Sequence, residues 1–174
     1  IQILKNKNGL NYGNKKITVS TSGIANKIQE AAEEIGTYLA LSLHAPNDEL
    51  REKIMPINKK FKIQDLVKQL KYYTSIVKEP IFLEYVMLKG VNDTEQCAKQ
   101  LVNLMAQFPS KVNLIEFNSW PGVKFEPTER KDIEKFSKYI QDKGYMSFIR
   151  RSRGDDVLAA CGQLRTTSVL KKNL

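Results

Sequence analysis

The residue with the clearest capacity for chemistry is Cys161, which lies between small residues and Gly162 near the end of the 174-residue chain. A run of arginines precedes it, and Asp155 or Asp156 could cap a short helix by accepting backbone N–H groups. Cations near a thiol favour the thiolate, which is the nucleophilic form. The segment therefore predicts a reactive cysteine, although a small buried cysteine after a basic strand would have the same composition.

A second group of polar residues lies where apolar runs end: Ser20, Ser42, His44 and Asn118. Each has an ordinary structural alternative, since serine caps helices, a lone histidine is often structural, and asparagine near Pro-Gly favours a turn. An amide also offers a donor and an acceptor, which suits an amino-acid or adenine edge. The residue types alone leave both interpretations open.

Alternating apolar runs and helical stripes position these residues. The pattern predicts strands over 17–20, 38–43, 81–88, 112–117 and 146–150. It predicts helices over 24–35 and 63–77, and a short helix that is capped at 47 or 48 and ends at 54. A fourth helix is expected to begin at 92–93, and a fifth to begin at 127–128 and end at Gly144. Strands separated by helices imply parallel pairing, in an open doubly wound sheet or in part of a βα barrel. In both folds ligands bind at the carboxyl ends of the strands, where the polar group lies.

The charge balance is basic, with 28 Lys and Arg against 19 Asp and Glu, which favours a polyanionic partner such as nucleic acid. Arg151 and Arg153 lie close to Cys161, and arginine binds phosphate bidentately, so we expect them to contact RNA. The segment 55–60 is either another such contact or a surface loop. Two cysteines make no disulfide framework and no run is long enough for a membrane span, so we expect a cytoplasmic protein.

Short segments along the chain support a more specific hypothesis: 20–23, 41–48, 55–58, 84–88, 91–93, 113–115, 153–156 and 159–164. In this order they resemble the RlmN/Cfr family of radical-SAM enzymes, which methylate adenine in RNA. The resemblance covers about residues 15–165 and implies a partial six-stranded βα barrel. Residues 1–145 would supply its later strands, and residues 146–174 would supply the last strand, the cysteine segment and a basic tail.

The resemblance also implies roles for individual residues. Ser20, the segment Ser42, Leu43 and His44, and Asn118 would contact S-adenosylmethionine (SAM). Cys161 would carry the methyl group as S-methylcysteine before its transfer to C2 of an adenine. The implied partners are large-subunit ribosomal RNA and tRNA. A Cfr-like C8 methyltransferase and a non-catalytic basic RNA-binding domain are the alternatives.

One part of the radical-SAM machinery is missing from the sequence. The family holds a [4Fe–4S] cluster on Cys-x3-Cys-x2-Cys, whereas this chain has only Cys97 and Cys161. Cys97 lies on a helical apolar stripe and is expected in the core. No metal ligand is therefore predicted here. Because the chain also begins with Ile1, we expect it to be part of a longer, monomeric enzyme and to be inactive alone.

Overall fold

Five parallel strands form the sheet, in the order β1-β2-β3-β4-β5. The computed structural model describes residues 1–119 and 122–150. Within them the strands are β1 (Thr18–Thr21), β2 (Tyr38–Ser42), β3 (Ile81–Met87), β4 (Ser110–Glu116) and β5 (Ser147–Arg150). Each strand pairs in parallel with the strand before it, so the order never reverses. A doubly wound sheet requires such a reversal, and the topology is therefore that of a partial βα barrel.

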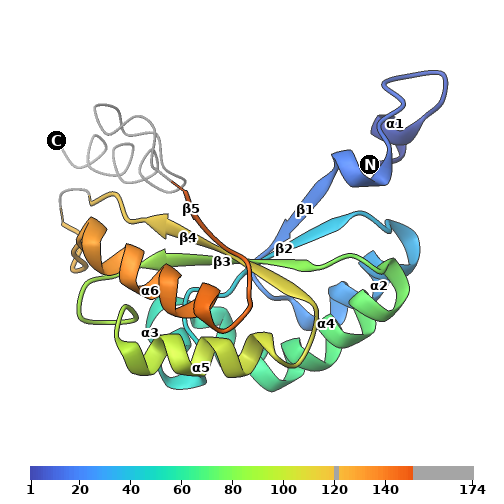
Figure 1. Cartoon of the computed structure of the whole chain (residues 1–174). Helices are drawn as coiled ribbons and strands as arrows, with labels where there is room; N and C mark the ends of the chain where they lie inside the picture. Colours follow the sequence, from blue (N-terminus) through green and yellow to red (C-terminus); the bar gives the residue numbers. More distant parts are fainter. Residues whose placement is uncertain (120–121, 151–174) are drawn as a thin grey trace, which may run out of the picture.

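Five helices lie on one side of this sheet (Figure 1): α2 (Ala25–Glu34), α3 (Asp48–Ile54), α4 (Ile63–Val77), α5 (Glu95–Met105) and α6 (Arg130–Asp142). A short α1 (Gln2–Lys5) and the 3-10 turn η1 (Asn14–Lys16) precede β1, and the 3-10 turn η2 (Pro56–Lys59) follows α3. No helix in residues 1–119 and 122–150 has the length and apolarity needed to cross a membrane.

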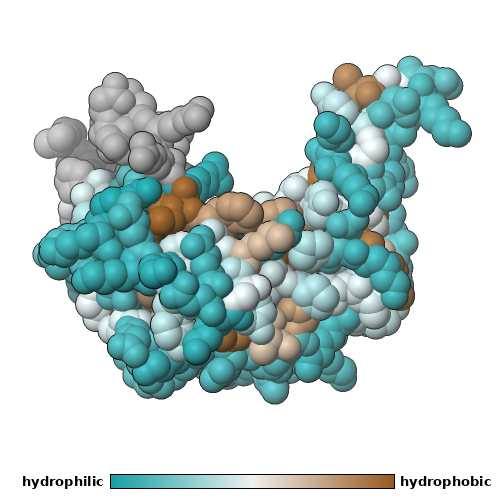
Figure 2. Space-filling model, in the orientation of Figure 1, coloured by the Kyte–Doolittle hydropathy of each residue, from teal (hydrophilic) through white to brown (hydrophobic). Residues whose placement is uncertain are grey.

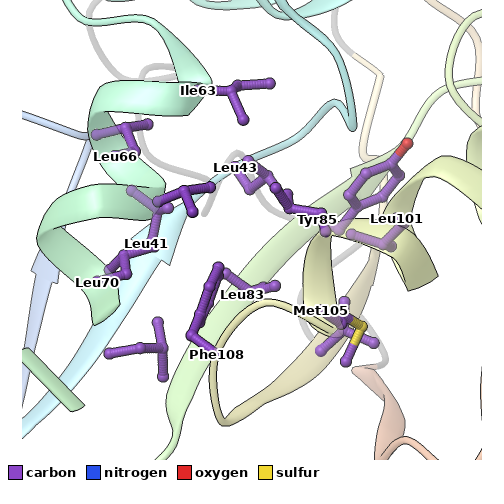
Figure 3. Packing of buried hydrophobic residues seen from close by; sticks show 14 of the residues in the cluster. Leu41, Leu43, Ile63, Leu66, Leu70, Leu83, Tyr85, Leu101, Met105 and Phe108 are labelled. Atoms are coloured by element: carbon purple, nitrogen blue, oxygen red, sulfur yellow. The ribbon is translucent and has the colours of Figure 1, made fainter. Parts of the chain in front are cut away.

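The core fills the space between the sheet and these helices. Figure 3 shows Leu83 and Tyr85 of β3 among side chains of α4, α5 and the segment after α5. Burial alternates strictly along β3, because successive side chains of a strand point to opposite faces. Burying each large apolar side chain contributes about 1.5–3 kcal/mol. Cys97 belongs to this core, as its position on the α5 stripe predicts.

The opposite face of the sheet carries the polar side chains of the alternation, and we call it the polar face. One row of paired residues contains Ser42, Glu84, Asn113 and Phe148. The preceding row contains Ser20, Ala40, Phe82 and Lys111. Ser20 and Ser42 therefore lie on neighbouring strands of one face, two positions apart in register.

Two predicted helix starts are wrong. Helix α5 begins at Glu95 behind a Thr94 cap, rather than at 92–93, because Asn92 is buried and bonded to the strand ends. Helix α6 begins at Arg130 rather than at 127–128. Pro127 instead bridges Leu88, and the Thr128 hydroxyl donates to Asp93 at 2.9 Å. These contacts between distant residues override the local start signals.

Candidate functional site

The carboxyl end of β2 is the best-defined part of the candidate site. The backbone N–H groups of Leu43 and His44 both donate to the carbonyl of Glu84, at 3.0 and 3.2 Å. His44 then adopts a left-handed conformation with φ of 57°, which ends the strand. Its Nδ1 accepts the N–H of Val86 at 3.2 Å, so the imidazole bonds to β3 where the backbone pairing of β2 with β3 has ended.

This hydrogen bond sets the state of the His44 ring. Since Nδ1 accepts, the proton of the neutral ring lies on Nε2. Burial, together with the smaller effect of the nearby Arg51 charge, lowers the pKa of His44 to about 4. Near pH 7 the ring is therefore neutral and has one donor, Nε2–H, left to offer.

A fully buried arginine, Arg51 of α3, holds the ends of the first two strands together. Its Nη2 donates to the carbonyls of Ser22 at 2.8 Å and Ser42 at 3.1 Å, and its Nε donates to the carbonyl of Leu43 at 3.1 Å. These carbonyls belong to the two segments that carry Ser20 and Ser42. Burial lowers the pKa of Arg51, although a guanidinium stays charged throughout the range in which proteins fold.

Gly23 provides the space that Arg51 needs. Its φ is 100°, a conformation that L-residues rarely adopt. A Cβ at this position would lie 2.9 Å from Nη2 of Arg51 and 3.3 Å from the side chain of Leu66. The glycine of the Ser-Thr-Ser-Gly segment is therefore required by the close approach of the arginine.

Behind Arg51 lies a second layer of polar contacts. Arg51 Nη1 donates to Oδ1 of Asn58 at 2.9 Å, and Asn58 donates to Oδ1 of Asp48 at 2.8 Å. The same Asp48 oxygen accepts the N–H of Ile63 at the start of α4. Asn58 is fully buried, so this part of the 55–60 segment is neither a surface loop nor an RNA contact.

Asn92 fixes the other side of the His44 turn. Its amide donates to the carbonyls of His44 and Val86, both at 2.7 Å, and accepts the N–H of Leu88 at 2.7 Å. A buried amide with all these bonds made rigidifies the loop that it connects. Sequence reasoning missed both Arg51 and Asn92, because most of their partners are main-chain atoms, which carry no residue signature.

The predicted SAM contacts are only partly brought together. Ser20 is exposed and Ser42 half-buried on the polar face, and His44 follows directly. The side chain of Leu43 is buried in the core, and its N–H and carbonyl bond to Glu84 and Arg51. Asn118 lies two residues past the end of β4, where strand alternation no longer sets its direction. The contacts of all five residues with a ligand stay predictions.

Other predicted site residues lie outside the described residues: Cys161, Arg151 and Arg153. Strand β5 is continuous with the rest of the sheet, while the predicted boundary at 145/146 stays a prediction.

A groove of about 270 Å³ between β1 and α2 includes Ser20 but neither Ser42 nor His44. Apolar side chains such as Ile24 and Ile28 form much of its lining. We therefore place the candidate site at the end of β2 and not in this groove.

Metal ligands do not cluster within residues 1–119 and 122–150. No three His, Cys, Asp or Glu side chains there are arranged to hold a metal ion. Cys97 is buried in the core, and the whole sequence has one further cysteine. The residues of this chain therefore do not fit a [4Fe–4S] cluster, which needs several cysteine thiolates.

Comparison with known sequences gives consistent relatives. The chain is 47% identical over 167 residues to a protein of Azorhizobium caulinodans named dual-specificity RNA methyltransferase RlmN. The aligned region covers 95% of this chain and 41% of that relative. The chain is 46% identical over 170 residues to the protein of the same name from Hyphomonas neptunium, covering 97% of this chain and 44% of the relative. The chain thus spans about two fifths of the length of these relatives. No protein-family model matches it.

Solved structures agree with the sequence relatives. A radical SAM methyltransferase from Sphaerobacter thermophilus superposes with a TM-score of 0.88 at 37% identity, over 93% of this chain and 48% of that one. A domain of a pyruvate-formate lyase-activating enzyme from Bacteroides vulgatus gives a TM-score of 0.61 at 14% identity, over 76% of this chain and 80% of that one. The second likeness is one of fold alone, and both match the partial barrel.

Proposed function

We propose, from the premise that the chain belongs to the RlmN family of RNA methyltransferases, that it forms the SAM-binding and methyl-carrying part of an adenine-C2 methyltransferase. The proposed substrates are ribosomal RNA and tRNA. The observation that carries the proposal is the end of β2, where Arg51 and Asn92 hold Ser42 and His44 in one geometry beside Ser20.

The residues at this position are suited to bind and orient a small polar ligand. The hydroxyls of Ser20 and Ser42 can donate or accept, and neutral His44 adds a donor at Nε2. SAM, when bound, supplies the methyl group. Preorganised donors lose little freedom on binding, so a rigid β2 end favours affinity and orientation.

Cys161 is proposed as the methyl carrier. Strand β5 ends at Arg150, beside Ile115 of β4, so the chain leaves the sheet at the edge that holds Ser42 and His44. Cys161 follows eleven residues later, within reach of that edge. Peptide mass spectrometry of the complete enzyme is expected to find an added methyl on the Cys161 peptide. A methyl on the Cys97 peptide would contradict this assignment.

The [4Fe–4S] cluster is proposed to be held by residues that this chain does not contain. The residues described here have binding and orienting roles in the proposal, and no step is assigned to the cluster.

Titration of the chain with SAM by isothermal calorimetry tests the proposal. We expect one saturable site, with affinity reduced about five- to tenfold by Ser42→Ala, because a net hydrogen bond contributes about 1 kcal/mol. Ser110→Ala is the matched control, since Ser110 starts β4 at the opposite edge of the same sheet. The proposal is wrong if the chain shows no saturable binding, or if both variants weaken it equally.

A further inference from the structure

Glu84 on the polar face has a carboxylate that is only half satisfied. Its Oε1 accepts the amide of Asn113 at 2.8 Å. Its Oε2 is shielded from solvent and has no hydrogen-bond partner among residues 1–119 and 122–150. Nor does Glu84 form an ion pair with any described residue.

An orphaned oxygen of this kind is uncommon because it is costly. Burying a polar atom without a partner costs about 1–3 kcal/mol, and more if it is charged. Most buried polar atoms therefore have a partner. Here the sheet fixes the carboxylate, because Glu84 lies mid-strand and Asn113 is its direct neighbour on β4. The orphan oxygen is thus held in place for a donor that comes from elsewhere.

The position of Glu84 connects it with the proposed SAM site. Ser42 is its direct neighbour on β2, and the carbonyl of Glu84 accepts the N–H groups of Leu43 and His44. The orphan oxygen therefore belongs to the same row of the polar face as Ser42.

The charges around Glu84 indicate what kind of donor fits. On the polar face, Lys111 lies two positions before Asn113, and Arg150 lies two positions after Phe148. The Lys111 ammonium is 5.7 Å from the centre of the Phe82 ring, also on this face. These two basic residues share the polar face with Glu84 and disfavour a further cation there, so a neutral hydroxyl is a better partner than an ammonium.

We propose that Glu84, oriented by Asn113, binds a ribose hydroxyl of a nucleoside ligand on the polar face. A carboxylate that accepts from a ribose hydroxyl is a recurrent feature of nucleotide-binding α/β proteins. The ribose belongs to SAM if the proposed function holds, on which this assignment rests. The ribose of an RNA nucleotide offers the same chemistry.

Binding measurements with paired probes test the assignment on the chain as it stands. The probes are SAM, 5′-methylthioadenosine and the 2′,3′-dideoxy form of 5′-methylthioadenosine. We expect Glu84→Gln to weaken SAM and methylthioadenosine binding about fivefold, since it replaces a charge-assisted acceptor with a neutral donor. Binding of the dideoxy probe should be weak in the parent chain and unchanged by Glu84→Gln. This unchanged binding also shows that the variant is folded.

The control is Glu116→Gln, the same substitution on β4 at a carboxylate that pairs with Arg130 of α6. It should leave all three affinities unchanged. A parallel arm compares a short RNA with the DNA of the same sequence. Loss of the RNA preference in Glu84→Gln, with unchanged SAM binding, supports the assignment and identifies RNA as the source of the ribose.

The failures are distinguishable. If the parent chain binds no SAM, the proposed function fails, and the RNA arm alone then decides the role of Glu84. If the parent chain binds SAM but Glu84→Gln affects the ribose and dideoxy probes equally and leaves the RNA preference intact, the ribose assignment is wrong and the proposed function stands.

Discussion

The end of β2 and the middle of the polar face differ in whether their polar atoms have hydrogen-bond partners. At the end of β2 the carbonyls of Ser22, Ser42 and Leu43 are all bonded by Arg51. In the middle of the face, Oε2 of Glu84 has no described partner. Figure 2 shows a hollow in the molecular surface beside the N-terminal segment, with both polar and apolar residues on its floor.

The difference separates scaffold from binding surface. A network whose members are all satisfied holds its geometry without a ligand. An acceptor without a partner, such as Oε2 of Glu84, gains a hydrogen bond only when a ligand supplies the donor. The first region is therefore expected to show its sensitivity in stability, and the second in affinity.

The largest expected effect concerns Arg51. Arg51→Met removes the donors to three carbonyls at the strand ends and to Oδ1 of the buried Asn58, so we expect the free energy of unfolding to fall by about 3 kcal/mol. Arg51→Lys should recover only part of the loss, because one ammonium cannot span partners on both strand ends. Urea denaturation measures both. Arg130→Met, at a surface arginine with two acidic partners, is the control and should show no comparable loss.

A smaller effect is expected from pH. The pKa of His44 is about 4 in the fold against an ordinary value of 6.5, so the unfolded chain binds the proton first as pH falls. The contribution of neutral His44 is therefore complete above about pH 6.5 and is lost progressively down to about pH 4. The loss is on the order of 2–3 kcal/mol.

His44 is the single histidine of the chain, so its ring signals in NMR report this titration directly. His44→Gln should flatten the dependence of stability on pH between 6.5 and 4. A ring that titrates near 6.5 in the folded chain would contradict the buried, Nδ1-accepting geometry.

The smallest stability effect in this series concerns Gly23. Gly23→Ala should cost about 2 kcal/mol in the free energy of unfolding, because the new Cβ meets Arg51 in a left-handed backbone conformation. Gly13→Ala is the matched control, since Gly13 has φ of −67° and no atom within 4 Å of the added Cβ. If both variants lost the same free energy of unfolding, the close approach of Arg51 would not be the reason for glycine at position 23.

Sequence patterns predict the frame of this molecule better than its site. Strand and helix bounds such as 63–77 follow from apolar periodicity, and the polar face follows from alternation within strands. Arg51 could not be predicted, because a charged residue in a helix such as α3 usually lies on the surface. Asn92 has the local signal of a helix start, and its actual role depends on a contact with His44 that only the folded chain creates.

Asn118 shows where prediction from pattern ends. It follows β4 by two residues, and beyond a strand the direction of a side chain depends on the loop and not on alternation. Its convergence with Ser20, Ser42 and His44 stays a prediction, as do the monomeric state and cytoplasmic location of the protein.

An NMR titration of the ¹⁵N-labelled chain with SAM tests the central claim most directly. The account predicts that the amide signals of Ser20, Ser42, His44 and Asn118 shift together along one binding curve, while those of α5 around Cys97 stay in place. Shifts confined to the groove between β1 and α2, or no shifts at saturating SAM, would contradict a ligand site at the end of β2.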